Sequence, residues 1–128
     1  MTIIEFPGQP AANGFSNVAV VAPGSRLIHT SGQVAIDADG TVPAGFEEQT
    51  RLVFRNLEAV LASAGAGWGD VLKLTYFVTG VEELPVVRRV RDEFVDVTRP
   101  PASSLVQVAG LFRTDLLIEV EAVAALKA

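Results

Sequence analysis

Residues 49–80, "QTRLVFRNLEAVLASAGAGWGDVLKLTYFVTG", change their hydrophobic period once, and this change decides the fold. In the first half, an apolar stripe at helical spacing consists of Val53, Phe54, Leu57, Val60, Leu61 and Ala64. The second half, "DVLKLTYFVTG" (70–80), is rich in β-branched and aromatic residues, which favour a strand. The spacing therefore predicts a helix that begins near Phe46 and ends before Gly65, followed by a turn and a strand.

The segments on either side of this stretch predict two further strands and one more helix. Residues 17–36, "NVAVVAPGSRLIHTSGQVAI", are typical of two strands joined by a turn at Pro23-Gly24-Ser25. A second helix is predicted from Glu82 to Val97, and Pro85 is acceptable in its first turn. Its apolar face consists of Leu84, Val87, Val90, Phe94 and Val97.

The C-terminal part of the chain predicts the last two strands. They are residues 103–110, "SSLVQVAG", and 116–126, "LLIEVEAVAAL", with a hairpin-like connection through residues 111–115. The order strands, helix, strand, helix, strands is typical of the α+β class. We therefore predict a single domain over residues 1–128, with a mixed sheet and two helices on one of its faces.

The second face of this sheet needs a cover of its own. The central strand has apolar residues on both faces, namely Val71, Leu72, Leu74, Phe77 and Val78. Packing the helix-free face against another subunit would bury them, and closed symmetric oligomers are the common outcome. We therefore expect a homo-oligomer.

Composition narrows the possible partners and chemistry. The formal charge of −5 disfavours nucleic acid, because binding phosphates needs clustered Lys and Arg. The chain has no cysteine and one histidine, which excludes thiolate chemistry and multi-His metal sites. No apolar run approaches the roughly 20 residues that span a bilayer, and the start, "MTIIEFPGQP", does not resemble a signal peptide. We expect a cytoplasmic protein with no membrane partner.

Two pairs of polar residues are candidates for catalysis. His29 and Ser31 are predicted to share a strand face, as a nucleophile and its base would, but no sharp turn presents the serine. Glu119 and Glu121 also share a face, roughly 7 Å apart by strand rise. They are either a solvated edge of the sheet, or one of them is a general base that acts on a water molecule.

Arg88, Arg89 and Arg91 form a basic cluster on the predicted second helix. Arg88 precedes Asp92 by one helical turn, and Arg89 precedes Glu93 by the same spacing. Ion pairs within the helix, on its solvated face, explain the cluster. Phosphate binding is disfavoured by the acidic balance of the chain.

Five segments in the same order resemble the YjgF/RidA family, the reactive intermediate deaminases. "GFSNVAVV" (14–21) resembles the family's Gly-Pro-Tyr-Ser-Gln segment, and "LIHTSGQVAID" (27–37) resembles its strand ending in Ser-Gly-Gln. Residues 49–80 resemble its long helix, turn and strand. "RPPASSLVQVAGL" (99–111) matches its Arg-Pro-x-Ala-Arg-Ser segment in part, and "IEVEAVA" (118–124) resembles its Glu-Ile-Glu-Ala ending.

The resemblance implies a chorismate-mutase-like homotrimer that binds a small molecule in clefts between subunits, without cofactor or metal. It also implies hydrolysis of enamines and imines, such as 2-aminoacrylate or 2-iminobutyrate, to a keto acid and ammonia. By position, Glu119 would orient the attacking water, and the Ser31-Gly32 turn would help to position the substrate. The backbone near Leu105 would line the same cleft.

Three positions depart from the family pattern. Ser103 stands where the deaminases have the arginine that grips the substrate carboxylate, Phe15 replaces a tyrosine, and Arg88 replaces a position that is often asparagine. A guanidinium–carboxylate pair makes charge-assisted bonds worth roughly 1.5–3 kcal/mol each. Its loss argues against efficient action on 2-imino acids, unless Arg88 or Arg113 supplies a guanidinium from another direction.

Two functions remain open from the sequence. The first is a hydrolase that attacks a C=N bond with a water held by Glu119, on a substrate other than the usual 2-imino acids. The second is a non-catalytic trimer that binds or senses a small ligand on the same scaffold.

Overall fold

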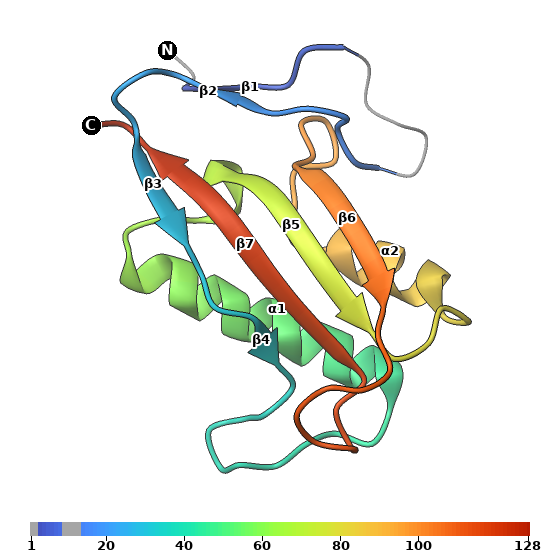
Figure 1. The fold of residues 1–128 in the computed structure, drawn as a ribbon. Coiled ribbons are helices and arrows are strands. Elements are labelled where there is room, and N and C mark those ends of the chain that lie inside the picture. Colours follow the sequence, from blue (N-terminus) through green and yellow to red (C-terminus); the bar gives the residue numbers. More distant parts are fainter. Residues whose placement is uncertain (1–2, 9–13) are drawn as a thin grey trace.

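A five-stranded sheet with both helices on one face forms the domain in a computed structural model that describes residues 3–8 and 14–128 (Figure 1). The helices are α1 (Phe46–Ser63) and α2 (Leu84–Arg91). The strands of the sheet are β3 (Arg26–His29), β4 (Gln33–Val34), β5 (Val71–Val78), β6 (Ala102–Gln107) and β7 (Ile118–Leu126). The predicted α+β class with two helices on one face is confirmed.

Strand β7 lies at the centre of the sheet. The strand order is β3-β7-β5-β6, and β4 also pairs with β7. The β5–β6 pair is parallel and the pairs made by β7 are antiparallel, so the sheet is mixed as predicted. Two short strands, β1 (Ile4–Glu5) and β2 (Val20–Val21), form a separate antiparallel pair, and a short 3₁₀ helix, η1 (Trp68–Asp70), precedes β5.

Helix α1 follows the predicted stripe closely. Val53, Phe54, Leu57 and Leu61 are fully buried, whereas Val60 is half-buried and Ala64, just past the end of the helix, is exposed. The helix ends where expected, because Gly65 has a φ of +82°, a conformation that glycine adopts without a steric penalty.

The core lies between the two helices and the covered face of the sheet. The ring of Phe54 stands 5.4 Å from that of Trp68, 6.2 Å from that of Tyr76 and 5.3 Å from that of Phe94. Since α2 contributes its buried Val87 and Val90 to the same cluster, the aromatic groups hold α2 next to β5. This contact positions the site described below.

Helix α2 is shorter than predicted, ending at Arg91 and not at Val97. After Arg91 the chain tightens into i→i+3 turns, in which the N–H of Phe94 donates to the carbonyl of Arg91. This turn places the ring of Phe94 against that of Phe54. A helix that continued past Arg91 would not need to make this contact. Val97, predicted on the apolar face, is 58% exposed.

The predicted hairpin between the last two strands is wrong. Strand β5 lies between β6 and β7, and the segment connecting β6 to β7 crosses its end. Polarity accounts for this order: β6 carries Ser103, Ser104 and Gln107 and occupies an edge, whereas β7 has a continuous apolar side and occupies the centre.

The first two predicted strands also pair differently from expectation. The turn exists, since the Ser25 hydroxyl donates to the Ala22 carbonyl at 2.7 Å, but β2 pairs with β1 and β3 pairs with β7. The second predicted strand is divided into β3 and β4, with one extra residue between them relative to β7. The Thr30 hydroxyl accepts the N–H of Ala122 at 3.0 Å and holds this irregularity in place.

Ion pairs join α2 and the turn that follows it to α1, and they do not join successive turns of α2. Arg89 pairs with Glu47 of α1, and Glu93 pairs with Arg51 of α1 at 2.6 Å. The predicted pairing of Arg89 with Glu93 is therefore wrong, as is that of Arg88 with Asp92, because Asp92 pairs with its neighbour Arg91. The facing helix offers both Arg89 and Glu93 a partner of opposite charge, which sequence spacing within α2 does not reveal.

The helix-free face of the sheet is uncovered in the described chain (Figure 1). Its apolar side chains include Leu27, which is 55% exposed, and Val106, which is 45% exposed. Such a surface is consistent with the expected homotrimer, which stays a prediction. Within the described residues, neither helix has the length and apolar character needed to cross a membrane.

Gln49 is a buried polar side chain that fixes the start of β7. Its Nε2 donates to the carbonyls of Pro43 and Asp115, both at 2.8 Å, and its Oε1 accepts the N–H of Leu117 at 2.9 Å. The residue is 1% exposed, so these three backbone groups depend on it for their hydrogen bonds. Gln49 thereby anchors the segment that leads into Glu119.

We expect Gln49→Leu to lower the free energy of unfolding by roughly 2–4 kcal/mol, because it leaves buried backbone groups without partners. Urea denaturation followed by circular dichroism measures this. The matched control is Gln33→Leu. The Gln33 side-chain amide donates an exposed hydrogen bond to the Ser31 carbonyl, and loss of this hydrogen bond should cost less than about 1 kcal/mol. Equal effects of the two substitutions would contradict the anchoring role of Gln49.

Candidate functional site

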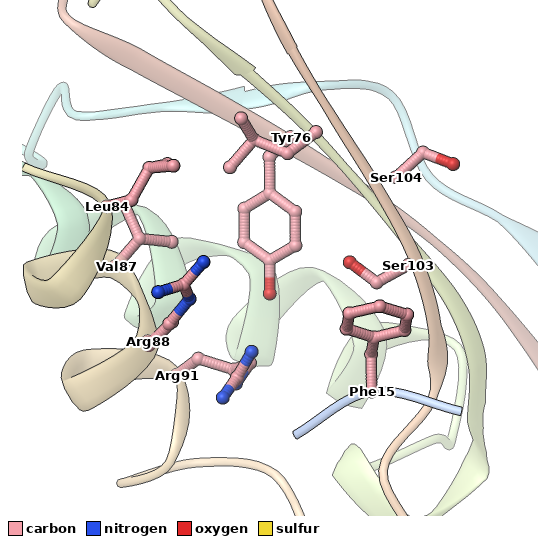
Figure 2. A pocket seen from close by; sticks show the side chains of 9 residues that line it. Phe15, Tyr76, Leu84, Val87, Arg88, Arg91, Ser103 and Ser104 are labelled. Atoms are coloured by element: carbon pink, nitrogen blue, oxygen red, sulfur yellow. The ribbon is translucent and has the colours of Figure 1, made fainter. Parts of the chain in front are cut away.

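A pocket of about 190 Å³ opens between α2 and the β5–β6 edge of the sheet (Figure 2). A single water needs roughly 10–15 Å³, so the pocket has room for a small organic molecule. It is lined by Phe15, Tyr76, Leu84, Val87, Arg88, Arg91, Ser103, Ser104 and Leu105. Four of the predicted binding residues, Phe15, Arg88, Ser103 and Leu105, therefore lie together.

The parallel register of β5 and β6 creates one wall of the pocket. Ser103 is level with Leu74, and Leu105 is level with Tyr76, so all four side chains lie on the helix-covered face. Phe15 is held at the rim because the neighbouring Ser16 donates its hydroxyl to the carbonyl of Pro100 at 2.6 Å. The uncharged segment around Ser103 is thus a pocket wall.

The opposite wall supplies positive charge from α2. Arg88 and Arg91 are one helical turn apart, and Figure 2 shows both guanidinium groups turned toward the pocket. Arg91 is 7% exposed, and its Nε donates to the Asp92 carboxylate at 2.9 Å. No carboxylate is among the described residues that line the pocket, so the lining is positively charged.

Tyr76 presents a buried hydroxyl to the same space. The residue is 2% exposed, and its hydroxyl has no hydrogen-bond partner in the described part of the chain. Burial raises the pKa of the Tyr76 phenol well above its usual value, while the positive charge of Arg91 acts in the opposite direction. The phenol is therefore a neutral hydrogen-bond donor at physiological pH.

Glu119 and Gly32 meet at a second location, on the helix-free face of the sheet. The adjacent Ile118 and Val120 are fully buried on the helix side, so the alternation of β7 places Glu119 on the other face. Its side chain lies directly against Gly32, where a Cβ atom would come within 2.6 Å of Cδ of Glu119. Residue 32 must therefore lack a side chain for this carboxylate to occupy its position.

The predicted site residues thus form two groups on opposite faces of the sheet. One consists of Phe15, Arg88, Ser103 and Leu105 in the pocket, and the other of Ser31, Gly32 and Glu119. Strand β5 separates β6 from β7, so the fold of one chain does not bring the groups into one cleft. The predicted cleft between subunits would require a second copy of the chain.

The remaining candidates have different outcomes. His29 ends β3 and Ser31 lies beyond it in the irregular segment, so the prediction that they share a strand face is wrong. Glu121 does share the face of Glu119, as predicted, since β7 continues through both residues. Arg113 pairs with Asp115 at 2.7 Å and is not among the residues that line the pocket.

The sequence does not identify Arg91 and Tyr76 as pocket residues. The basic cluster that contains Arg91 is explained by ion pairs on a solvated face, although the spacing of three residues between Arg88 and Arg91 places both on one helix face. Tyr76 alternates with Leu74 and Val78 and reads as an ordinary core position. In the described residues no group of three or more His, Asp or Glu side chains is arranged to hold a metal ion.

Comparison with known proteins agrees with this architecture. The family model described as "Endoribonuclease L-PSP" matches residues 7–126. A RutC family protein of Synechocystis sp. is 36% identical over 129 residues, which covers 98% of this chain and 97% of the relative. The 2-iminobutanoate/2-iminopropanoate deaminase of Escherichia coli is 36% identical over 102 residues, 77% of this chain and 79% of the relative.

Solved structures give the same assignment. The crystal structure of Escherichia coli TdcF with bound serine superposes with a TM-score of 0.74 at 32% identity, over 99% of this chain and 100% of that one. Sequence and fold agree over nearly the whole length. The chain therefore belongs to the YjgF/RidA family, the Rid or reactive intermediate deaminase proteins.

Proposed function

We propose that this protein hydrolyses an imine, or an enamine after its conversion to the imine, in clefts between the subunits of a homotrimer. The observation that carries the proposal is the contact of Glu119 with Gly32. Because residue 32 is a glycine, the Glu119 carboxylate lies directly against the backbone of that residue, on the face where another subunit would pack. Glu119 makes no ion pair within the described residues, so its carboxylate is available to a water molecule.

The chemistry needs one base and one water. Glu119 accepts a proton from the water as the oxygen attacks the C=N carbon, and it passes this proton to the nitrogen, which gives a carbinolamine. The hydroxyl proton of this tetrahedral intermediate then passes through the same carboxylate to the nitrogen as the C–N bond breaks, so that ammonia leaves and a carbonyl compound remains. The backbone at Ser31 and Gly32 would position the substrate beside the carboxylate.

Because residue 103 is a serine, the proposed substrate is not one of the usual 2-imino acids. Its side chain lines the pocket where the family's deaminases place an arginine, and a neutral hydroxyl cannot replace a bidentate guanidinium. We infer that the C=N bond is presented on a different carbon skeleton. The 2-iminobutanoate named for the Escherichia coli relative would be a poor substrate here.

The test is ammonia release by the purified protein from imines generated in solution, including 2-iminobutanoate and imines without a carboxylate. Light scattering on the same sample measures the mass, which should be three times that of the chain. We expect acceleration on at least one imine other than 2-iminobutanoate. Intact trimers that accelerate none of them would refute the hydrolase, and a monomer would refute the shared cleft.

A non-catalytic ligand-binding trimer is the second candidate. The observation in its favour is that the described residues of a single chain supply hydrogen-bond donors to the pocket but no carboxylate that could serve as a base. A chain that binds without bringing Glu119 to the ligand would show ligand-induced thermal stabilisation and no turnover.

A further inference from the structure

Three donor groups converge in the pocket, and none of the three comes from β6. The guanidinium groups of Arg88 and Arg91 project from α2, and the Tyr76 hydroxyl points between them and Ser103 (Figure 2). The hydroxyl is buried without a partner in the described chain. A buried donor left unpaired is costly, so a ligand that accepts its hydrogen bond would remove a defect of the free protein.

Arg91 is held in place by the fold and still has free donors for a ligand. Its Nε is used by Asp92, whereas Nη1 and Nη2 make no hydrogen bond within the described residues. Gly14 packs against the guanidinium, where a Cβ atom would stand 3.1 Å from Cζ of Arg91. The absence of a side chain at residue 14 therefore leaves space for the planar group, whose Nη2 is the atom nearest to Gly14, and the guanidinium still faces the pocket (Figure 2).

We propose that Arg91, Arg88 and the Tyr76 hydroxyl form a carboxylate subsite, and that the substrate is an imine whose carboxylate is not attached to the C=N carbon. The inference rests on the proposed function for the C=N bond. The subsite lies on the α2 side of the pocket, across from Ser103 on β6. The guanidinium groups of Arg88 and Arg91 lie on α2 and not on β6. A carboxylate bound to them is therefore displaced from the position that an arginine at residue 103 would give it.

The chemistry of the three groups selects a carboxylate. A guanidinium binds a carboxylate through two parallel N–H bonds, and a neutral phenol adds a third donor to the same anion. The described lining contains no carboxylate side chain, and Asp92, outside the lining, occupies only Nε of Arg91, although the whole chain carries a charge of −5. The small Ser103 side chain leaves room for the carbon skeleton between the two walls.

Calorimetric titration of the full chain with 4-oxopentanoate, whose carboxylate is two methylene groups from the carbonyl, tests the subsite. We expect it to bind more tightly than 2-oxobutanoate and at least tenfold more tightly than the uncharged 4-oxopentanamide. Arg91→Met should weaken binding roughly tenfold to a hundredfold, the worth of a lost charge-assisted bond. Arg88→Met, on the exposed side of the pair, gives the same test if Arg91→Met fails to fold.

Tyr76→Phe separates a ligand role from a structural one. Removing a buried hydroxyl that has no partner among the described residues should leave the thermal midpoint of the free protein equal or higher, yet weaken 4-oxopentanoate binding several-fold. A purely structural tyrosine would not change the affinity. The matched control is Arg89→Met, because Arg89 pairs with Glu47 outside the pocket and its loss should leave binding unchanged.

Three results would overturn the subsite: equal binding of the acid and the amide, tighter binding of 2-oxobutanoate, or unchanged affinity in both Arg91→Met and Arg88→Met. Binding without turnover of any imine would retain the subsite and refute the hydrolase. Turnover of uncharged imines without carboxylate binding would do the reverse. The two proposals therefore fail separately.

Discussion

Replacing Glu119 by Gln is expected to lower kcat for imine hydrolysis by at least a hundredfold. The amide matches the carboxylate in shape and fits against Gly32, but it cannot take a proton from water. General-base catalysis contributes roughly 10²- to 10⁴-fold to a rate, so the loss should fall in this range. Steady-state ammonia release, compared with wild type on the best imine found, measures it.

Two further variants show whether the effect belongs to the carboxylate at this position. Glu121→Gln changes the other carboxylate on the same face of β7 and should retain activity near that of wild type. Gly32→Ala keeps Glu119 but places a methyl group where its carboxylate lies, so kcat should fall without loss of the base itself. If Glu119→Gln and Glu121→Gln are equally active, Glu119 is a solvated residue of the sheet and not the base.

The elements that the sequence predicts well are those defined by local periodicity. Helix α1 and strand β5 each bury one face against the same core, so the period of 3.6 and the alternation of β5 are both visible in a short window. Gly65 ends the helix through its own backbone preference, which is also a local property. These elements needed no knowledge of the rest of the chain.

The choice of strand neighbours was not predictable in the same way. Strand β6 is adjacent to β7 along the chain, yet it pairs with β5 after crossing over through α2. The ion pairs show the same limit, because Glu93 has Arg89 at helical spacing but pairs with Arg51 of α1. Both outcomes depend on which elements pack together, which is a property of the whole fold.

The candidate site also contains residues that the sequence predicts and residues that only the packing of the fold reveals. The resemblance led to Glu119 and Gly32, and the structure places them in contact. The resemblance did not lead to Arg91 or Tyr76. An arginine beside an aspartate is interpreted as a surface ion pair, and a tyrosine in an alternating strand is interpreted as a core residue. Whether such side chains face a pocket depends on how α2 docks beside β5.

The two walls of the pocket would bind a substrate carboxylate at different positions, and Ser103→Arg tests this directly. The substitution restores a guanidinium on β6, where a 2-imino acid would present its carboxylate. We expect kcat/KM for 2-iminobutanoate to rise roughly tenfold to a hundredfold, as one or two charge-assisted bonds are regained. Ser103→Met is the matched control, since it adds similar bulk without charge and should give no gain.

The same substitution should also change stability in a way that depends on the ligand. A third guanidinium would enter a pocket already lined by Arg88 and Arg91, with no carboxylate in the described lining to offset it. Like charges about 4 Å apart repel by roughly 1 kcal/mol or more at a solvated site, so the free Ser103→Arg protein should melt earlier than wild type. Added 2-oxobutanoate should restore the melting temperature, because its carboxylate neutralises the added charge. If Ser103→Arg and Ser103→Met behave alike in both activity and melting, then the residue at 103 does not contact the substrate, and the serine at this position does not determine the substrate of the proposed hydrolysis.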